Sequence, residues 1–140
     1  MSESENAAAA RRIVDAFNRR DLDSVLADLD PDVQLDEWQD APGAQSYRGP
    51  EGVRKGLDSW FETWEWMQVD IEELRDMGDR ILFRLHQRAK GRGSGIELEI
   101  TSWNVYSFRD GKVTHMQLFT SREPALEAAG LVTNYQEEKR

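Results

Sequence analysis

The early part of the chain carries apolar residues at helical spacing. Residues 5–20 place them on one face, which predicts a helix, and Asp21 suits the N-cap of a second short helix that ends before Pro31. The clearest helix opens at Gly49-Pro50, because proline fits the first helical position. Its apolar positions recur three and four residues apart and form one broad stripe of five side chains: Val53, Leu57, Trp60, Phe61 and Trp64.

Strand signals dominate the rest of the chain. Residues 33–37 alternate between apolar and polar side chains and predict a short strand, and stretch 39–49, with its glycines and proline, predicts a loop. Four longer strand-like stretches follow the clearest helix, separated by glycine-containing turns: residues 67–75, 80–90, 96–108 and 112–120. A short helix over 125–129 ends the pattern. Helices followed by a four-strand meander predict an α+β domain with helices on one face of an antiparallel sheet.

The turn at residues 109–111 predicts how the last two strands pair. A three-residue turn with Gly111 in the left-handed position would pair Tyr106 with Thr114 and Asn104 with Met116. One face of this hairpin then carries Leu98, Ile100, Ser102, Asn104, Tyr106, Met116 and Leu118. The opposite face carries Trp103, Val105, Val113, His115, Gln117 and Phe119. Because both faces hold large apolar groups, we expect helices to cover one and a second copy of the chain to cover the other.

Length, charge and residue content limit which classes of function are compatible with the chain. The length of 140 residues suits one domain, which we assign to residues 1–131, followed by a polar tail over 132–140. A formal charge of −9 argues against a nucleic-acid partner and against adsorption to an anionic membrane. The chain has no cysteine, and its histidines are His86 and His115, so we expect no metal and no cofactor. We also see neither a membrane-length apolar run nor a signal-peptide-like start, and expect a cytoplasmic protein.

Several stretches resemble the nuclear transport factor 2-like superfamily. Residues 13–33, IVDAFNRRDLDSVLADLDPDV, are similar to its opening. Three further motifs are similar to its SnoaL-like branch: YRGPEGV at 47–53, RDGKV at 109–113 and REPALEAAGL at 122–131. The resemblance implies an α+β cone, in which a curved antiparallel sheet wraps around N-terminal helices and leaves a central pocket. The superfamily includes isomerases, cyclases, hydrolases, dehydratases and non-catalytic members, so the resemblance implies a fold rather than one reaction.

The resemblance also carries known catalytic positions onto this chain. The carboxylate base of ketosteroid isomerases matches Glu37 and their oxyanion-hole acid matches Asn104, whereas their first-helix tyrosine falls at Ile13. Limonene epoxide hydrolases activate water with an Arg and two Asp, and those positions match Arg80, Leu82 and Leu118. The acid-base Asp of SnoaL-type cyclases falls near Thr120 or Ser121. None of these catalytic sets is complete in this chain.

Glu37 is the strongest candidate for chemistry. If it shares a strand face with Val33 and Leu35, its carboxyl points into an apolar interior, where desolvation raises the pKa towards that of a useful base. A strand-end glutamate that reaches solvent or an arginine is an equal alternative. Asp36 lies on the other side of the strand, and we expect it to be solvated.

Strand 80–90 allows two registers. Alternation alone points Ile81, Phe83 and Leu85 towards the helices. The register implied by the resemblance instead turns Arg84 and His86 into the pocket, and we follow this second interpretation. It predicts a polar pocket cluster that either acts on a ligand or only satisfies itself as buried pairs: Glu37, Arg84, His86 and Asn104. It also predicts a homodimer through Phe83, Leu85, Trp103, Val105 and Phe119.

Large apolar side chains complete the predicted pocket. Those expected to bind the ligand are Phe17, Trp38, Trp60, Phe61, Trp64, Tyr106, Met116 and Leu118, and three of them also suit an ordinary helix core. We therefore predict a SnoaL-like pocket protein for a small apolar or carbonyl-containing, polyketide-like molecule.

Two functions are compatible with that pocket. An enzyme would be a cofactor-independent isomerase, cyclase or hydratase, with Glu37 as the acid-base group and Asn104, with His86 or Arg84, stabilising an oxyanion. The alternative is a non-catalytic module of the same fold that binds a lipophilic ligand or serves as an accessory dimer. The residues leave both open.

Overall fold

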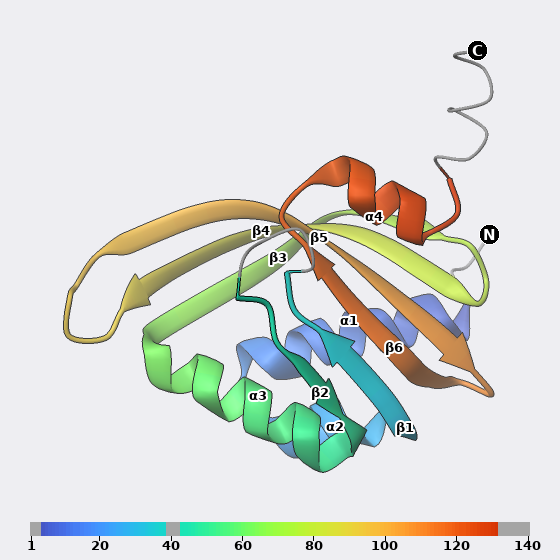
Figure 1. Cartoon of the computed structure of the whole chain (residues 1–140), viewed down its shortest axis with the longest axis horizontal. Helices are drawn as coiled ribbons and strands as arrows, with labels where there is room; N and C mark the ends of the chain where they lie inside the picture. Colours follow the sequence, from blue (N-terminus) through green and yellow to red (C-terminus); the bar gives the residue numbers. More distant parts are fainter. Residues whose placement is uncertain (1–3, 39–42, 132–140) are drawn as a thin grey trace.

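The computed structural model describes residues 4–38 and 43–131. Four helices and six strands form within these ranges (Figure 1). The helices are α1 (Glu5–Asn18), α2 (Leu22–Ala27), α3 (Gly49–Thr63) and α4 (Arg122–Ala128). The strands are β1 (Leu29–Asp36), β2 (Ser46–Arg48), β3 (Trp64–Asp76), β4 (Arg80–Gly91), β5 (Glu97–Arg109) and β6 (Lys112–Phe119). The predicted tail, 132–140, lies outside the described residues.

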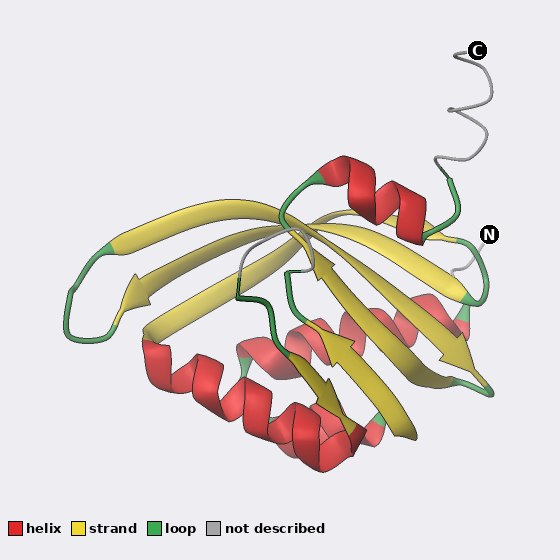
Figure 2. Ribbon diagram, in the orientation of Figure 1, coloured by secondary structure: helices red, strands yellow, loops and turns green. Residues whose placement is uncertain are grey.

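The strands form one sheet in the order β2-β1-β6-β5-β4-β3. The pair β1 and β6 is parallel, and every other pair is antiparallel. The sheet curves over α1, α2 and α3, while α4 lies on its opposite face (Figure 2). We call the face towards α1–α3 the inner face and the other the outer face. This architecture confirms the predicted α+β fold with a curved sheet around N-terminal helices.

Local signals explain where the helices begin and end. The hydroxyl of Ser4 accepts a hydrogen bond from the Ala7 N–H and caps α1, and Asp21 caps α2 in the same way through the Ser24 N–H, as predicted. Proline occupies the first turn of α3. That helix stops at Thr63, so Trp64 is the first residue of β3 rather than the last of the helical stripe.

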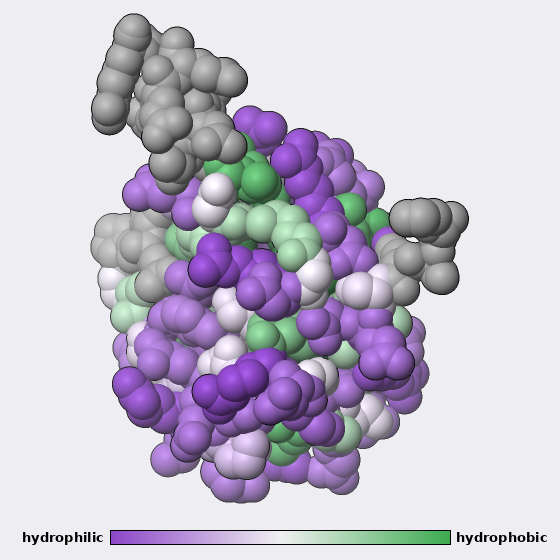
Figure 3. Space-filling view, turned by 90° about the vertical axis from the view of Figure 1, so that its right-hand side faces the viewer, coloured by the Kyte–Doolittle hydropathy of each residue, from purple (hydrophilic) through white to green (hydrophobic). Residues whose placement is uncertain are grey.

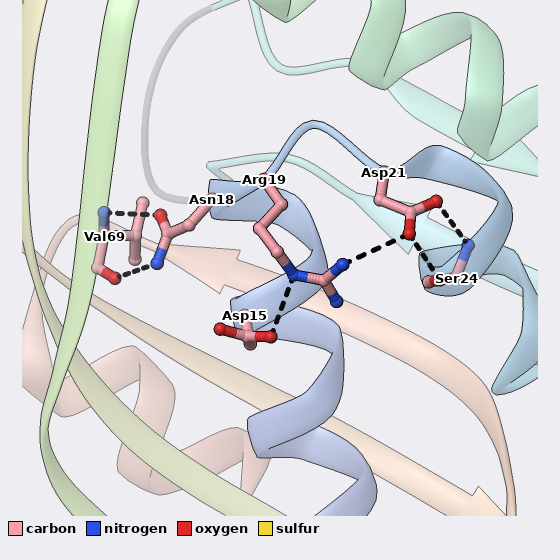
Figure 4. Close-up of polar contacts among 6 residues, drawn as sticks. All are labelled: Asp15, Asn18, Arg19, Asp21, Ser24 and Val69. Atoms are coloured by element: carbon pink, nitrogen blue, oxygen red, sulfur yellow. Dashed lines mark hydrogen bonds and ion pairs between the residues drawn. The ribbon is translucent and has the colours of Figure 1, made fainter.

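Asn18 ties the end of α1 to the free edge of β3. Its side-chain amide donates to the Val69 carbonyl at 2.7 Å and its oxygen accepts from the Val69 N–H at 2.8 Å (Figure 4). The strand β3 is the last of the sheet, so it has a neighbouring strand on one side only. The amide therefore takes the place of a neighbouring strand at this one residue and satisfies two half-buried backbone groups.

Within residues 4–38 and 43–131, buried apolar side chains form two clusters. The larger cluster fills the space between the inner face and α1–α3, and its most enclosed members include Ile13, Val33, Val53, Ile81 and Phe83. The smaller cluster lies under α4 on the outer face and consists of Leu82, Val105, Phe119, Ala125 and Ala129. The surface seen in Figure 3 is mainly hydrophilic, with apolar residues in small separate areas, as the high content of charged residues predicts.

The strand β4 follows simple alternation rather than the register taken from the resemblance. Ile81, Phe83 and Leu85 are buried against the inner cluster, so Arg84 and His86 project from the outer face. There Arg84 lies near two glutamates of β3, and His86 lies 3.4 Å from Glu99. The predicted inward orientation of Arg84 and His86 is therefore wrong. On the outer face, carboxylates pair with these two side chains. In an apolar interior both would lose their hydration, which costs free energy.

This correction also changes the predicted dimer face. Phe83 and Leu85 lie in the inner core and cannot form an outer surface. Val105 and Phe119 are buried, with Trp103 beside them, in the cluster that packs on α4. Part of the apolar outer face is thus covered by the chain's own last helix, and dimerisation stays a prediction.

The hairpin of β5 and β6 has a different register from the predicted one. Arg109 lies opposite Lys112 across a two-residue turn, and Tyr106 lies opposite Met116. A bulge lies between these pairs, where the register shifts beyond Ser107. Because of the bulge, Val113 turns into the inner core, whereas Asn104, Tyr106, Met116 and Leu118 share the inner face as predicted. Among the described helices none is long and apolar enough to cross a membrane.

Candidate ligand pocket

A cavity of about 90 Å³ lies between the inner face of the sheet and the helices and is partly open to solvent. Four elements supply most of its wall: α1, α3, β5 and β6. Its apolar lining consists of Ile13, Val14, Phe17, Val25, Leu35, Trp38, Gly56, Leu57, Trp60, Val69, Leu85, Met116 and Leu118. Its polar lining is Glu37, Gln87, Asn104 and Tyr106. Such a cavity, mainly apolar with a few converging polar groups, is typical of a small-molecule site.

Glu37 brings a carboxyl group into this apolar wall. It follows the last residue of β1 on the same side as Leu35, which confirms the inward orientation. Burial raises the pKa of the Glu37 carboxyl above its ordinary value, and a hydrogen bond with the backbone of Gln45 works weakly in the opposite direction. Burial and the Glu37 charge together raise the pKa of the nearby Tyr47 hydroxyl. Glu37 is therefore a partly desolvated acid at the cavity wall, not a fully solvated strand end.

Asp36 is buried on the outer face, contrary to the prediction that it is solvated. Its carboxylate accepts hydrogen bonds from the Ser46 hydroxyl at 2.6 Å and from the Gln34 amide at 2.9 Å. The His115 ring nitrogen lies 2.7 Å from its other oxygen. Burial would raise the pKa of Asp36, but the three hydrogen bonds outweigh it and lower the pKa below its ordinary value. This network fixes the outer side of β1 next to Glu37.

Three tryptophan rings lie next to one another at the cavity. The ring of Trp60 lies 6.0 Å from that of Trp38 and 6.0 Å from that of Trp64, measured between centroids. Its indole N–H points to the Met67 sulfur at 3.1 Å. Trp38 has a positive φ of 27°, which is rare for a bulky residue and turns the chain sharply after Glu37. Trp38 and Trp60 line the cavity, whereas Trp64 packs against Trp60 in an edge-to-face contact and does not line it.

The polar groups on β4 and β5 complete the wall. Asn104 is buried, and its amide oxygen has no hydrogen-bond partner among the described residues. Burial raises the pKa of the Tyr106 hydroxyl, and the neighbouring Asn104 amide acts against this shift. Gln87 donates to the Ser102 hydroxyl at 2.6 Å. The Asn104 amide oxygen is thus an unpaired acceptor for an N–H or O–H group that enters the cavity.

The structure brings together only part of the predicted site. Glu37 and Asn104 line one cavity, whereas Arg84 and His86 lie on the other face of the sheet. Of the predicted ligand-binding side chains, Phe17, Trp38, Trp60, Tyr106, Met116 and Leu118 line the cavity. Phe61 does not; its ring packs on Phe17 at 5.1 Å, and Arg20 stacks over it. Within the described residues no cluster of His, Asp and Glu could hold a metal ion.

Sequence reasoning missed two polar residues: Gln87, which lines the cavity, and Tyr47, which lies near Glu37 without lining it. Gln87 continues the alternation that points Leu85 inward, so that pattern alone would have placed it in the wall. Tyr47 lies in β2, a strand of three residues inside the predicted loop, and no periodic signal marks it.

Comparison with known proteins identifies relatives of this fold. Residues 10–116 match the SnoaL-like domain family. A search of curated proteins found no match. An NTF2-like protein of unknown function from Burkholderia pseudomallei K96243 superposes with a TM-score of 0.76 at 23% identity, over 93% of this chain and 98% of that chain.

Two further solved structures are similar. TerC, co-crystallised with polyporic acid, has a TM-score of 0.75 at 20% identity, over 93% of this chain and 99% of that chain. A candidate SnoaL-like polyketide cyclase from Jannaschia sp. CCS1 has a TM-score of 0.75 at 18% identity, over 90% and 92% of the two chains. At these identities the likeness shows the fold alone. The family match spans most of the chain, and with it the curved sheet, the helices beneath it and the cavity between them identify the protein as a member of the SnoaL-like domain family.

Proposed function

We propose that the protein binds a small, mainly apolar molecule with a carbonyl group in this pocket and that Glu37 moves a proton on it. The observation that carries the proposal is the position of Glu37: among the described residues that line the cavity it has the one carboxylate. Its raised pKa makes it a stronger base than a solvated glutamate once it is ionised. TerC, a neighbour in fold, was co-crystallised with polyporic acid, which supports a small-molecule ligand for a protein of this fold.

The step requires two groups. The Glu37 carboxylate takes a proton from the carbon next to the ligand carbonyl, the C–H electron pair forms a carbon–carbon double bond, and the carbonyl oxygen takes up the negative charge. Asn104 lines the same cavity, and its NH2 group can donate to that oxygen. Return of the proton to the same or another carbon gives exchange or isomerisation, and no cofactor takes part in this sequence.

Proton exchange on a small ketone tests this step directly. The probe is 1-indanone, which has an apolar aromatic body and exchangeable hydrogens beside its carbonyl. In D2O the wild-type protein is expected to accelerate loss of these hydrogens, followed by proton NMR. Glu37→Gln should abolish the acceleration and retain binding, which shifts in the side-chain signals of Trp38 and Trp60 report.

A matched control separates the pocket from the rest of the sheet. Glu99→Gln makes the same change at an exposed outer-face residue paired with His86, and should exchange 1-indanone like the wild type. Equal acceleration by the wild type and by Glu37→Gln would contradict the role of Glu37.

Non-catalytic binding is the second candidate, and a specific observation favours it. Arg84 and His86 lie outside the cavity, and Ile13 occupies the wall where the resemblance would place a donor. Of the four side chains in the predicted polar cluster, Glu37 and Asn104 alone line the cavity. Binding of 1-indanone without any exchange would support this candidate, and absence of binding would contradict both.

A further inference from the structure

A second cavity, of about 150 Å³, lies on the outer face of the sheet beside α4. We call it the arginine groove. Its lining residues are Glu73, Arg75, Leu82, Arg84, Trp103, Arg122 and Leu126. It belongs to a different face from the pocket described above, so its role does not depend on the proposed function.

Strand register builds the floor of the groove. Arg84 of β4 lies between its two cross-strand partners, Glu73 of β3 and Trp103 of β5. In the neighbouring row Leu82 lies opposite Arg75. Residues two apart on a strand share a face, so these five side chains stand next to one another on the outer face.

The helix α4 supplies the remaining wall. It packs on Leu82, Val105 and Phe119, and this contact brings Arg122 and Leu126 over the two rows. The groove therefore joins residues more than forty positions apart in the chain. Its lining combines three guanidinium groups with an indole and two leucine side chains.

Charge in the groove is opposite to the charge of the protein. The lining carries three guanidinium groups against the carboxylate of Glu73, and Glu72 beside Arg84 adds a second carboxylate at its edge. The groove is thus net positive, whereas the whole chain has a formal charge of −9. Within the described part of the chain, Arg75 and Arg122 have no ion-pair partner. A concave positive site on an acidic protein concentrates small anions.

Arg84 is incompletely satisfied by its own neighbours. Its Nε lies 3.4 Å from Glu72 and its Nη1 lies 3.7 Å from Glu73, both beyond good hydrogen-bond geometry. The Nε atom is shielded from solvent and has no hydrogen-bond partner among the described residues. A buried N–H without an acceptor costs free energy, and a carboxylate matches the planar guanidinium edge with two parallel bonds.

We propose that the arginine groove binds a small organic carboxylate, with the carboxylate between Arg84, Arg75 and Arg122 and the apolar body against Trp103 and Leu126. The indole and the leucine side chains favour a ligand with an apolar body, which an inorganic anion lacks. The guanidinium groups require the negative charge, which a neutral analogue lacks.

Titration with benzoate tests both requirements. The probe is sodium benzoate at constant ionic strength, and the readouts are the Trp103 indole N–H and the arginine Nε–H signals in nitrogen-15 NMR. Saturable shifts are expected with benzoate at millimolar concentration, and much weaker shifts with benzamide or inorganic phosphate. Equal shifts with benzamide would overturn the role of charge, and equal shifts with phosphate would overturn the role of the apolar wall.

Variants show whether the binding belongs to the groove. Arg75→Gln and Arg122→Gln change exposed side chains, and each should weaken benzoate binding by about tenfold. Arg88→Gln is the matched control: it lies on the outer face of β4, pairs with Asp70 outside the groove, and should bind benzoate like the wild type. An equal loss in all three variants, or no binding by the wild type, would overturn the proposal.

A second copy of the chain could also offer carboxylates to this groove. Sedimentation velocity with and without benzoate distinguishes a second copy of the chain from a free carboxylate as the occupant of the groove. A monomer that binds benzoate supports the proposed site. A dimer that dissociates in Arg122→Gln and does not bind benzoate would overturn it in favour of an interface.

Discussion

Asp36 and Glu37 are adjacent in the chain, yet the fold moves the pKa values of their carboxyl groups in opposite directions. Both lose hydration, which raises the pKa of each. Only Asp36 has hydrogen-bond donors that outweigh this effect, because Ser46, Gln34 and His115 surround it on the outer face. Glu37 turns to the apolar pocket instead. The Asp36 carboxylate thus anchors β1 through hydrogen bonds, whereas the Glu37 carboxyl faces the pocket with a raised pKa.

Glu37→Gln should make stability less sensitive to mild changes of pH. The folded-state pKa of Glu37 lies above its ordinary 4.5, so the native state holds a proton that the unfolded state releases. Protonated Glu37 therefore contributes to the free energy of unfolding at low pH. The wild type loses this contribution as pH rises from the ordinary pKa through the folded-state pKa, and the variant does not. Urea unfolding between about pH 4 and pH 8 should show a difference that grows in favour of the variant and then levels off.

The exposed Glu99 provides the control for that measurement. Glu99→Gln removes the same charge from a side chain that is 69% exposed, and its stability should follow the wild type at every pH. A constant difference between Glu37→Gln and the wild type across the range would mean that Glu37 is not desolvated.

Asp36→Asn should destabilise the protein at neutral pH by about 2–4 kcal/mol, because it replaces an acceptor for three buried bonds with a group that is partly a donor. The lowered pKa of Asp36 stabilises the native state above its ordinary value, and this contribution is lost as pH falls through the folded-state pKa. The difference from the wild type should therefore shrink in acid. Asp70→Asn, at a half-exposed ion pair with Arg88, should cost less than about 1 kcal/mol.

Gly56→Ala should destabilise the protein even though alanine favours helices. A Cβ at Gly56 would lie 2.8 Å from the Tyr47 ring, so the ring must move. Overpacking costs about 1–3 kcal/mol and outweighs a gain of about 1 kcal/mol in helix propensity. Gly52→Ala, one turn earlier in α3, meets Tyr47 only at 3.7 Å and should stabilise instead. Thermal unfolding of both variants compares the two effects, and a gain in both would contradict the tight contact.

The sequence predicts the fold well because each element has its own periodic signal. Alternation in residues 81–85 also points the right side chains inward, and the register taken from the resemblance does not. That register treats Arg84 and His86 as pocket residues, but acidic partners on neighbouring strands hold both on the outer face. Local patterning is the stronger guide here, since burying an unpaired charge costs more than any single packing contact gains.

The rest of the site depends on long-range contacts that no local pattern contains. The burial of Asp36 requires Ser46 from a three-residue strand and His115 from β6. The bulge that turns Val113 inward changes the hairpin by one residue without a distinct sequence signal. Asn18 likewise looks like a helix-end residue, but its partner is fifty-one positions away on β3.

Asn18→Ala should loosen the edge of the sheet that forms one wall of the pocket. The change leaves the N–H and C=O of Val69 half-buried and unpaired, which costs about 1–3 kcal/mol. Hydrogen exchange should therefore be faster at the Val69 amide than in the wild type, while amides at the centre of β5 keep their protection relative to global stability.

The side chain of Asn6 provides the matched substitution. It donates to the Gly78 carbonyl at 2.7 Å in an exposed setting, where water can replace the lost bond, so Asn6→Ala should cost no more than about 0.5 kcal/mol. Since Val69 lines the cavity, Asn18→Ala should also weaken binding of 1-indanone, and Asn6→Ala should not. Equal exchange rates at Val69 in the two variants would show that the strand edge holds its place without Asn18.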